Sequence, residues 1–191
     1  KHDNEFYTQE FRLASGGDSR INWVAGLFYS RELSDGVERF GTTAGADQKT
    51  FRMNNYYGVV AGKVTTQAIF GDLSIPMGER SRFNLGLRYT SEEKALPGEA
   101  GTGFLAGTPI IVKTGSTLQE SKPTWSIGFE HDVSDNHMIY AKVNTGFKSG
   151  TVNAIPPTVT IVNSFTDPEE ITAFQIGTKN YFRDGRVRLN A

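Results

Sequence analysis

Hydrophobic and polar residues alternate through residues 125–150 with the period of a half-buried β-strand. Trp125, Ile127 and Phe129 fall on one face, with small or polar residues between them. Residues 132–136 (DVSDN) are rich in side chains that bond their own backbone, so we expect the chain to reverse there. Alternation then resumes from Ile139 to Phe147. The pattern predicts an antiparallel hairpin followed by a long loop.

Other stretches repeat this alternation and predict further strands, at residues 6–15, 22–30, 66–75, 82–90 and 168–181, with a last strand starting at Val187. The cleanest is 82–90, where Phe83, Leu85, Leu87 and Tyr89 oppose polar residues and glycine. Residues 168–181 also fit a helix in length and glutamate content, but Gly177 and the β-branched residues favour a strand.

Short and long connections alternate along the chain. Tight reversals are predicted at Gly16, Gly78, Asp135 and Gly185, the last in an Asp-Gly pair suited to a hairpin turn. Long, glycine-rich or polar loops are expected at residues 31–65, 91–121 and 148–167, the first with room for further strand at its flanks, where residues 56–60 show a weak apolar pattern. Outer-membrane barrels place short turns at one rim and long loops at the other, so this order favours a membrane barrel over a soluble sandwich.

Apolar faces alone do not separate these two folds, since they can meet lipid or a protein core. On residues 22–30, Trp23 and Tyr29 are spaced like two interfacial aromatic girdles, yet the same rings would also fill a soluble core. From this strand alone, both interpretations stay open.

Composition narrows the function. The 191 residues carry 20 basic and 21 acidic side chains, so no basic surface suggests nucleic acid. Cysteine is absent, which excludes disulfides and thiolate sites. No apolar run is long enough for a membrane helix, and the residues from Lys1 onward do not have the pattern of a signal peptide, as expected if it was removed or if the chain is an internal fragment. Because the last strand stops at Ala191, we expect a fragment of a longer barrel.

Candidate chemistry is sparse. His2, His131 and His137 are scattered, and a solvated turn explains the last two better than a metal site. Asp132 and Asp135 fit turn chemistry better than a catalytic pair or a calcium loop. Serine-nucleophile and phosphate-binding motifs are not found. We therefore expect no enzyme activity, no metal and no cofactor.

Four segments resemble barrel strands of TonB-dependent outer-membrane receptors, in the order found in that family. They are FYTQEFRLAS at 6–15, FNLGLRYT at 83–90, MIYAKVNTGFKSG at 138–150 and PEEITAFQIGTKNYFRDGRVRLN at 168–190. The GFKSG step resembles the family's exit from a strand into an outer loop.

The resemblance implies a barrel of about 22 strands, closed by an N-terminal plug, that imports a scarce nutrient such as a ferric siderophore, cobalamin or a glycan. Residues 1–191 would be part of that barrel in the outer membrane of a Gram-negative bacterium, without the plug that contacts TonB and without the C-terminal strands. About eight antiparallel strands would form a curved, open sheet.

The two strand faces and the loops then have different expected roles. Leu85 and Leu87 would face lipid, whereas Arg82, Asn84 and Arg88 would face the wet interior. The candidates for substrate contact are aromatic residues expected in the long loops: Phe51, Tyr56, Tyr57 and Phe104. Packing of loop against loop is the favoured explanation of these rings.

Two other proteins fit the same pattern. One is a complete eight-stranded outer-membrane protein with a structural or adhesive role, which would close on itself. The other is a soluble β-sandwich that binds carbohydrate, which would need a second sheet and a sugar-stacking groove.

Overall fold

The structure, a computed structural model, describes residues 2–17, 19–40, 56–96, 101–105, 108–112, 116–153, 164–183 and 185–191. Across these residues no helix is long and apolar enough to cross a membrane. The strands are β1 (His2–Ala14), β2 (Asn22–Phe40), β3 (Tyr56–Met77), β4 (Ser81–Leu96), β5 (Gly101–Leu105), β6 (Thr108–Val112), β7 (Ser116–Ser134), β8 (His137–Lys148), β9 (Val152–Asn153), β10 (Ser164–Phe165), β11 (Glu169–Phe182) and β12 (Val187–Asn190).

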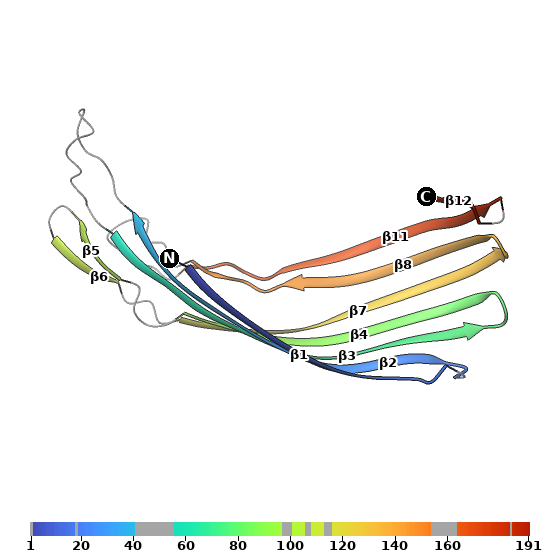
Figure 1. Cartoon of the computed structure of the whole chain (residues 1–191), viewed down its shortest axis with the longest axis horizontal. Helices are drawn as coiled ribbons and strands as arrows, with labels where there is room; N and C mark the ends of the chain where they lie inside the picture. Colours follow the sequence, from blue (N-terminus) through green and yellow to red (C-terminus); the bar gives the residue numbers. More distant parts are fainter. Residues whose placement is uncertain are drawn as a thin grey trace, which may run out of the picture.

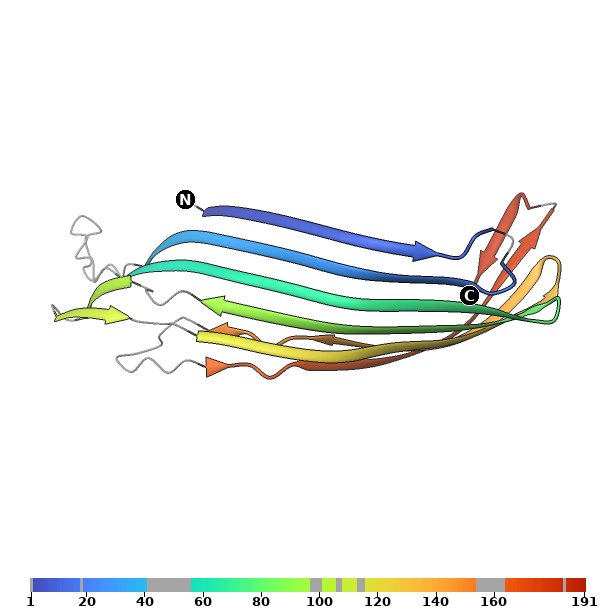
Figure 2. The ribbon, with the colours of Figure 1, turned by 90° about the horizontal axis from the view of Figure 1, so that it is seen from below.

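Eight of these strands lie side by side in the order β1-β2-β3-β4-β7-β8-β11-β12, which follows the chain. Every neighbouring pair is antiparallel. The β5–β6 hairpin extends this sheet beside β3, and β9 pairs only with β10. Figures 1 and 2 show a long, curved sheet that is open between β1 and β12. The predicted open antiparallel sheet is confirmed, and a self-closed eight-stranded barrel is excluded.

The predicted loops were too long. The ladder between β2 and β3 continues through Arg39 and Tyr57, inside the expected loop 31–65. Likewise β4 runs to Leu96, and β5, β6 and the start of β7 occupy much of the expected loop 91–121. Backbone hydrogen bonds hold these extensions, and they need no apolar face. Hydrophobic alternation therefore failed to mark where the strands end.

The tight reversals gather at one end of the sheet, and the long connections leave from the other (Figure 1). Gly78 and Gly185 adopt positive φ angles of 75° and 83°, which glycine tolerates without steric cost. Arg183 also has a positive φ, of 54°. The alternation of short and long connections is confirmed, and it places all tight turns at one end of the sheet and the long connections at the other.

One face of the sheet is a continuous apolar surface. Strand register places six apolar residues in one row across the strands: Trp23, Leu73, Leu85, Ile127, Val143 and Phe174. Leu87 and Phe174 are 62% and 80% exposed, so no second layer covers them. A sandwich would bury this face, and that alternative is therefore wrong. Trp23 and Tyr29 lie on the same face, which fits the girdle interpretation.

The apolar face has a defined height. On β4 it runs from Phe83 to Tyr89, about 20 Å along the strand at ~3.3 Å per residue. The next row towards the long connections is polar apart from one tyrosine, and consists of Tyr29, Gln67, Ser91 and Ser121. A band of this size matches the hydrocarbon-facing belt of outer-membrane barrels, about 25 Å tall. The strands continue beyond it, and on β4 residues 90–94 are polar on both faces.

Candidate functional site in the concave face

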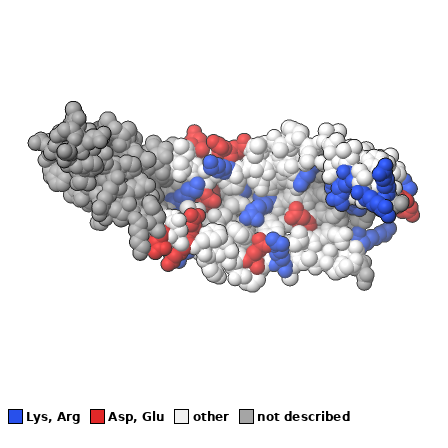
Figure 3. Space-filling view, turned by 45° about the horizontal axis from the view of Figure 1, so that its top comes forward, with Lys and Arg blue, Asp and Glu red and all other residues white. Residues whose placement is uncertain are grey.

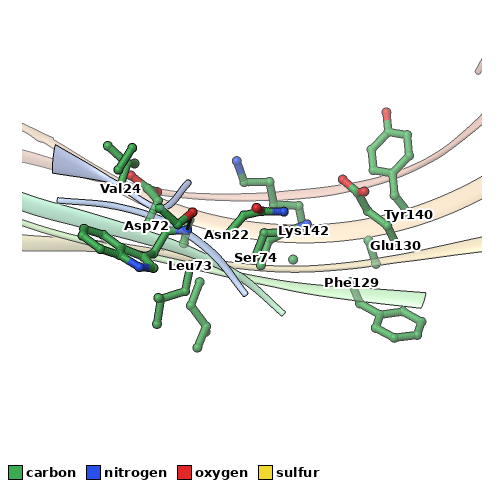
Figure 4. Close-up of a pocket in the computed structure, with 17 residues that line it drawn as sticks. Asn22, Val24, Asp72, Leu73, Ser74, Phe129, Glu130, Tyr140 and Lys142 are labelled. Atoms are coloured by element: carbon green, nitrogen blue, oxygen red, sulfur yellow. Dashed lines mark hydrogen bonds between the residues drawn. The ribbon is translucent and has the colours of Figure 1, made fainter. Parts of the chain in front are cut away.

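The opposite face of the sheet is polar and less exposed, as expected for the inside of a curved sheet. Figure 3 shows basic and acidic side chains distributed along it. In Figure 4, Asp72, Tyr140 and Lys142 project to one side of the sheet around a cavity of about 600 Å³, whereas Leu73 and Phe129 point to the other side. Register puts the expected interior residues Arg82, Asn84 and Arg88 on this polar face, in alternation with the apolar row. Their predicted separation from Leu85 and Leu87 is confirmed.

Near the tight turns the polar face carries exposed ion pairs. Arg82 Nε lies 3.2 Å from Glu130 Oε2, and another nitrogen of Arg82 lies 3.8 Å from Asp132 Oδ2. Arg80 lies 3.8 Å from Asp135 Oδ1. Exposed pairs of this kind contribute about 0–1 kcal/mol. The two aspartates that could suggest catalysis are thus partners of arginines at a turn.

The two histidines beside this turn have separate partners. His131 Nδ1 lies 2.9 Å from Ser81 Oγ, and His137 Nδ1 lies 2.8 Å from Asn180 Oδ1. The His137 ring also packs edge-on against Phe182, at 5.6 Å between centroids. In the part of the chain that the structure describes, no three metal-ligand side chains come together. Each histidine is therefore explained by its neighbours in the sheet.

Arg88 occupies the middle of the polar face and touches residues of three strands. Its guanidinium carbon lies 5.2 Å from the ring centroid of Phe28 on β2 and 5.6 Å from that of Phe70 on β3. Its Nε donates a hydrogen bond of 3.0 Å to Thr90 Oγ1. Cation–π contacts and this hydrogen bond fix the direction of the side chain.

Closer to the long connections, residues 149–151, here called the exit segment, follow β8 and lie against the polar face. Lys94 Nζ donates to the carbonyl oxygens of Ser149, at 3.4 Å, and Gly150, at 2.7 Å. Ser149 Oγ donates to Glu92, and the Gly150 N–H donates to Glu120 Oε2 over 3.0 Å. Lys94 and Glu120 thus bind the backbone of a segment that is remote in sequence, and Glu92 binds its serine hydroxyl.

Hydrogen bonds between Thr151 and Thr166 close the base of the loop that follows β8. Thr151 N–H donates to Thr166 Oγ1 at 2.8 Å, and Thr166 N–H donates to the Thr151 carbonyl at 2.9 Å. Gly150 is buried, and a β-carbon there would collide with the backbone of Thr166. The chain therefore enters and leaves the loop at one point above the polar face.

The structure describes three of the four aromatic residues predicted from the sequence to contact substrate. Phe51 lies outside the described residues. Tyr56 and Tyr57 begin β3, paired with Phe40 and Arg39, and Phe104 lies in β5. Their expected location in loops is therefore wrong for these three, because the ladder extends past the apolar band. Their contact with a substrate stays a prediction.

Glu92, Lys94 and Glu120 were not selected from the sequence. From the sequence, these charged residues are expected at a solvent-exposed strand end, since they follow the apolar alternation of 82–90. The alternation along β4 could have identified two of them, because Glu92 and Lys94 fall on the same face as Arg88 and Thr90. Only the fold of the exit segment gave those positions a partner.

An unclosed antiparallel sheet with one lipid-type apolar belt, one polar face and sorted connections defines the wall of a large β-barrel. The full chain, residues 1–191, matches the family model "TonB dependent receptor-like, beta-barrel". The chain belongs to the TonB-dependent receptor β-barrel family. A comparison with curated proteins finds no match.

Solved receptors share the fold. The ferric yersiniabactin uptake receptor FyuA from Yersinia pestis is 17% identical with a TM-score of 0.78, covering 95% of this chain and 27% of its own. The ferric-catecholate import receptor Fiu from E. coli K12 is 17% identical with a TM-score of 0.74, covering 99% and 30%. The copper transporter OprC is 18% identical with a TM-score of 0.69, covering 95% and 28%. The chain spans less than a third of each solved protein.

Proposed function

We propose that this chain forms part of the barrel wall of an outer-membrane receptor that takes up a scarce nutrient with energy supplied through TonB. The observation that carries the proposal is the separation of the two faces of the sheet. One side has an apolar belt about 20 Å high, and the other is a charged face to which the exit segment is hydrogen-bonded. A wall of this kind separates lipid from a polar conduit.

In this arrangement the tight turns face the periplasm, and the long connections face the outside and meet the substrate. Leu85 and Leu87 contact lipid, and Arg82, Asn84 and Arg88 line the interior. The protein is a transport receptor and not an enzyme. Residues 1–191 are one part of its barrel, and a plug domain outside this chain closes the conduit and contacts TonB.

The substrate is a small molecule captured from the medium, and an iron chelate is the first candidate. The solved receptors FyuA and Fiu are described as taking up ferric yersiniabactin and ferric catecholates, and OprC as transporting copper. These names support uptake of a metal complex. Glycans and cobalamin are the other substrate classes to be compared in the same assay.

Uptake by the complete receptor that carries this chain tests the proposal. The receptor is expressed in a Gram-negative strain lacking its own chelate receptors, and cell-associated ⁵⁵Fe is measured with ferric citrate, a ferric tris-catecholate and a ferric tris-hydroxamate. Labelled cyanocobalamin and a maltooligosaccharide serve as the other substrates. We expect uptake of at least one substrate, and its loss in an otherwise identical strain without TonB.

Fractionation supplies the control for location. The receptor is expected in the outer-membrane fraction, with heat-modifiable migration in detergent gels. A protein in the soluble fraction, or uptake that persists without TonB, would contradict the proposal.

A further inference from the structure

Arg88 lies between two cavities of the polar face. One, of about 410 Å³, is bounded by β4, by Thr124 of β7 and by residues 146–149. The other, of about 280 Å³, lies towards the tight turns and includes Phe70, Asp72 and Asn144. Arg88 is therefore the one basic side chain that lines both of these cavities.

The guanidinium is held in place but is not neutralised. Its contacts with Phe28 and Phe70 are to ring faces, and its hydrogen bond to Thr90 uses only Nε. Within the described residues no carboxylate forms an ion pair with Arg88, in contrast to Arg82, which lies near two. The terminal nitrogens, which carry the paired donors of an arginine fork, are left for a ligand.

The charge around the larger cavity is positive. Arg88, Lys94 and Lys148 line it together with one carboxylate, Glu92. That carboxylate is already engaged, because it lies 3.3 Å from Lys94 Nζ and accepts from Ser149 and from Thr66 Oγ1, the latter at 3.2 Å. Asp72 lines the smaller cavity, but within the described residues neither it nor Glu92 lies within ion-pair distance of Arg88.

We propose that Arg88 binds an anionic group of the transported molecule, one that presents two neighbouring oxygens to the guanidinium fork, as a carboxylate or a catecholate does. This inference rests on the proposed uptake function and adds the charge class of the substrate. Arginine suits such groups because its planar donors match them in pairs, and the rings of Phe28 and Phe70 keep the fork oriented before the ligand arrives.

Binding to the purified complete receptor in detergent tests the inference. Affinities are measured for ferric citrate and a ferric tris-catecholate as anionic probes, and for a neutral ferric tris-hydroxamate and cyanocobalamin. We expect the receptor to prefer an anionic probe. Arg88→Gln should weaken that binding by roughly 10- to 100-fold, in keeping with loss of a charge-assisted hydrogen-bonded pair. Arg88→Lys keeps the charge without the fork and should give an intermediate loss.

A matched control is Arg188→Gln, since Arg188 also lies over an aromatic ring, at 4.9 Å from Tyr181, but on β12 near the tight turns. It should bind like the unmodified receptor. Thermal unfolding of each variant separates lost binding from lost folding.

Three results would count against the inference. Preference for a neutral probe, or an Arg88→Gln affinity within about twofold of the unmodified receptor, overturns it while the uptake function stands. Failure to bind or import any probe removes the uptake function and this inference with it.

Discussion

The ammonium group of Lys94 lies 2.7 Å from the carbonyl oxygen of Gly150, although the two residues are separated by 56 positions in the chain. Glu92 and Glu120 bind the same short segment through Ser149 and the Gly150 N–H. The cluster directs the chain inward over the polar face as soon as β8 ends. The loop that follows is thereby positioned by the barrel wall itself.

Lys94→Met should loosen the exit segment. The substitution keeps the length of the side chain but leaves two backbone carbonyls without their donor, which costs about 1–3 kcal/mol. We expect a lower thermal midpoint in detergent and faster proteolytic cleavage between Thr151 and Thr166. Lys142→Met is the control, because Lys142 lies on the same face without an ion pair in the described structure and should change neither measurement.

Gly150→Ala should open the base of the loop. A β-carbon at this position would collide with the carbonyl group of Thr166 and would separate the two threonines that close the loop. Accelerated cleavage in the loop, with an unchanged unfolding midpoint for the barrel, is the expected result. Gly17→Ala has open space around it and serves as the control. Equal cleavage of both variants would contradict the assigned role of Gly150.

Gly26→Ala should disturb the aromatic support of Arg88. An added β-carbon would lie 2.8 Å from a ring atom of Phe70 and 2.7 Å from the Phe11 carbonyl oxygen, so the ring or the strand must shift. Overpacking of this kind costs about 1–3 kcal/mol. Gly71→Ala meets nothing closer than 3.5 Å and should cost much less. Denaturant unfolding of the two variants in the same detergent compares them directly.

Leu87→Arg should lower the free energy of unfolding more than an arginine placed on the opposite face of β4. Leu87 is 62% exposed on the apolar face, and a charge near the middle of a bilayer costs about 2–4 kcal/mol in a β-barrel. Asn84→Arg, on the polar face of the same strand, should cost less than about 1 kcal/mol. Reversible unfolding in lipid vesicles gives both values. Similar losses for the two variants would show that the apolar face does not contact hydrocarbon.

The local pattern was sufficient to predict the eight strands of the main sheet and their order, but not β5, β6, β9 and β10. Each face of a strand repeats every second residue, so the alternation in 82–90 and 125–147 gave both the element and its two sides. The turns at Gly78 and Gly185 were equally local, because a positive φ favours glycine. The family resemblance then supplied the expectation of a large barrel.

The ends of the strands were not predicted, and the reason is physical. On β4 both faces are polar from Thr90 to Lys94, so hydrophobicity carries no signal there, while the hydrogen-bond ladder continues to Leu96. The loop interpretation of Tyr56, Tyr57 and Phe104 failed for the same reason.

The sequence by itself determined which side chains share a face and where the chain reverses tightly, because both depend on near neighbours. The tertiary structure decided which residues meet across the polar face. Arg88 gains Phe28 and Phe70 from two other strands, and Gly150 meets Lys94 and Glu120 only when β4, β7 and β8 are in register. Contacts between strands depend on register and curvature, and these properties belong to the assembled sheet.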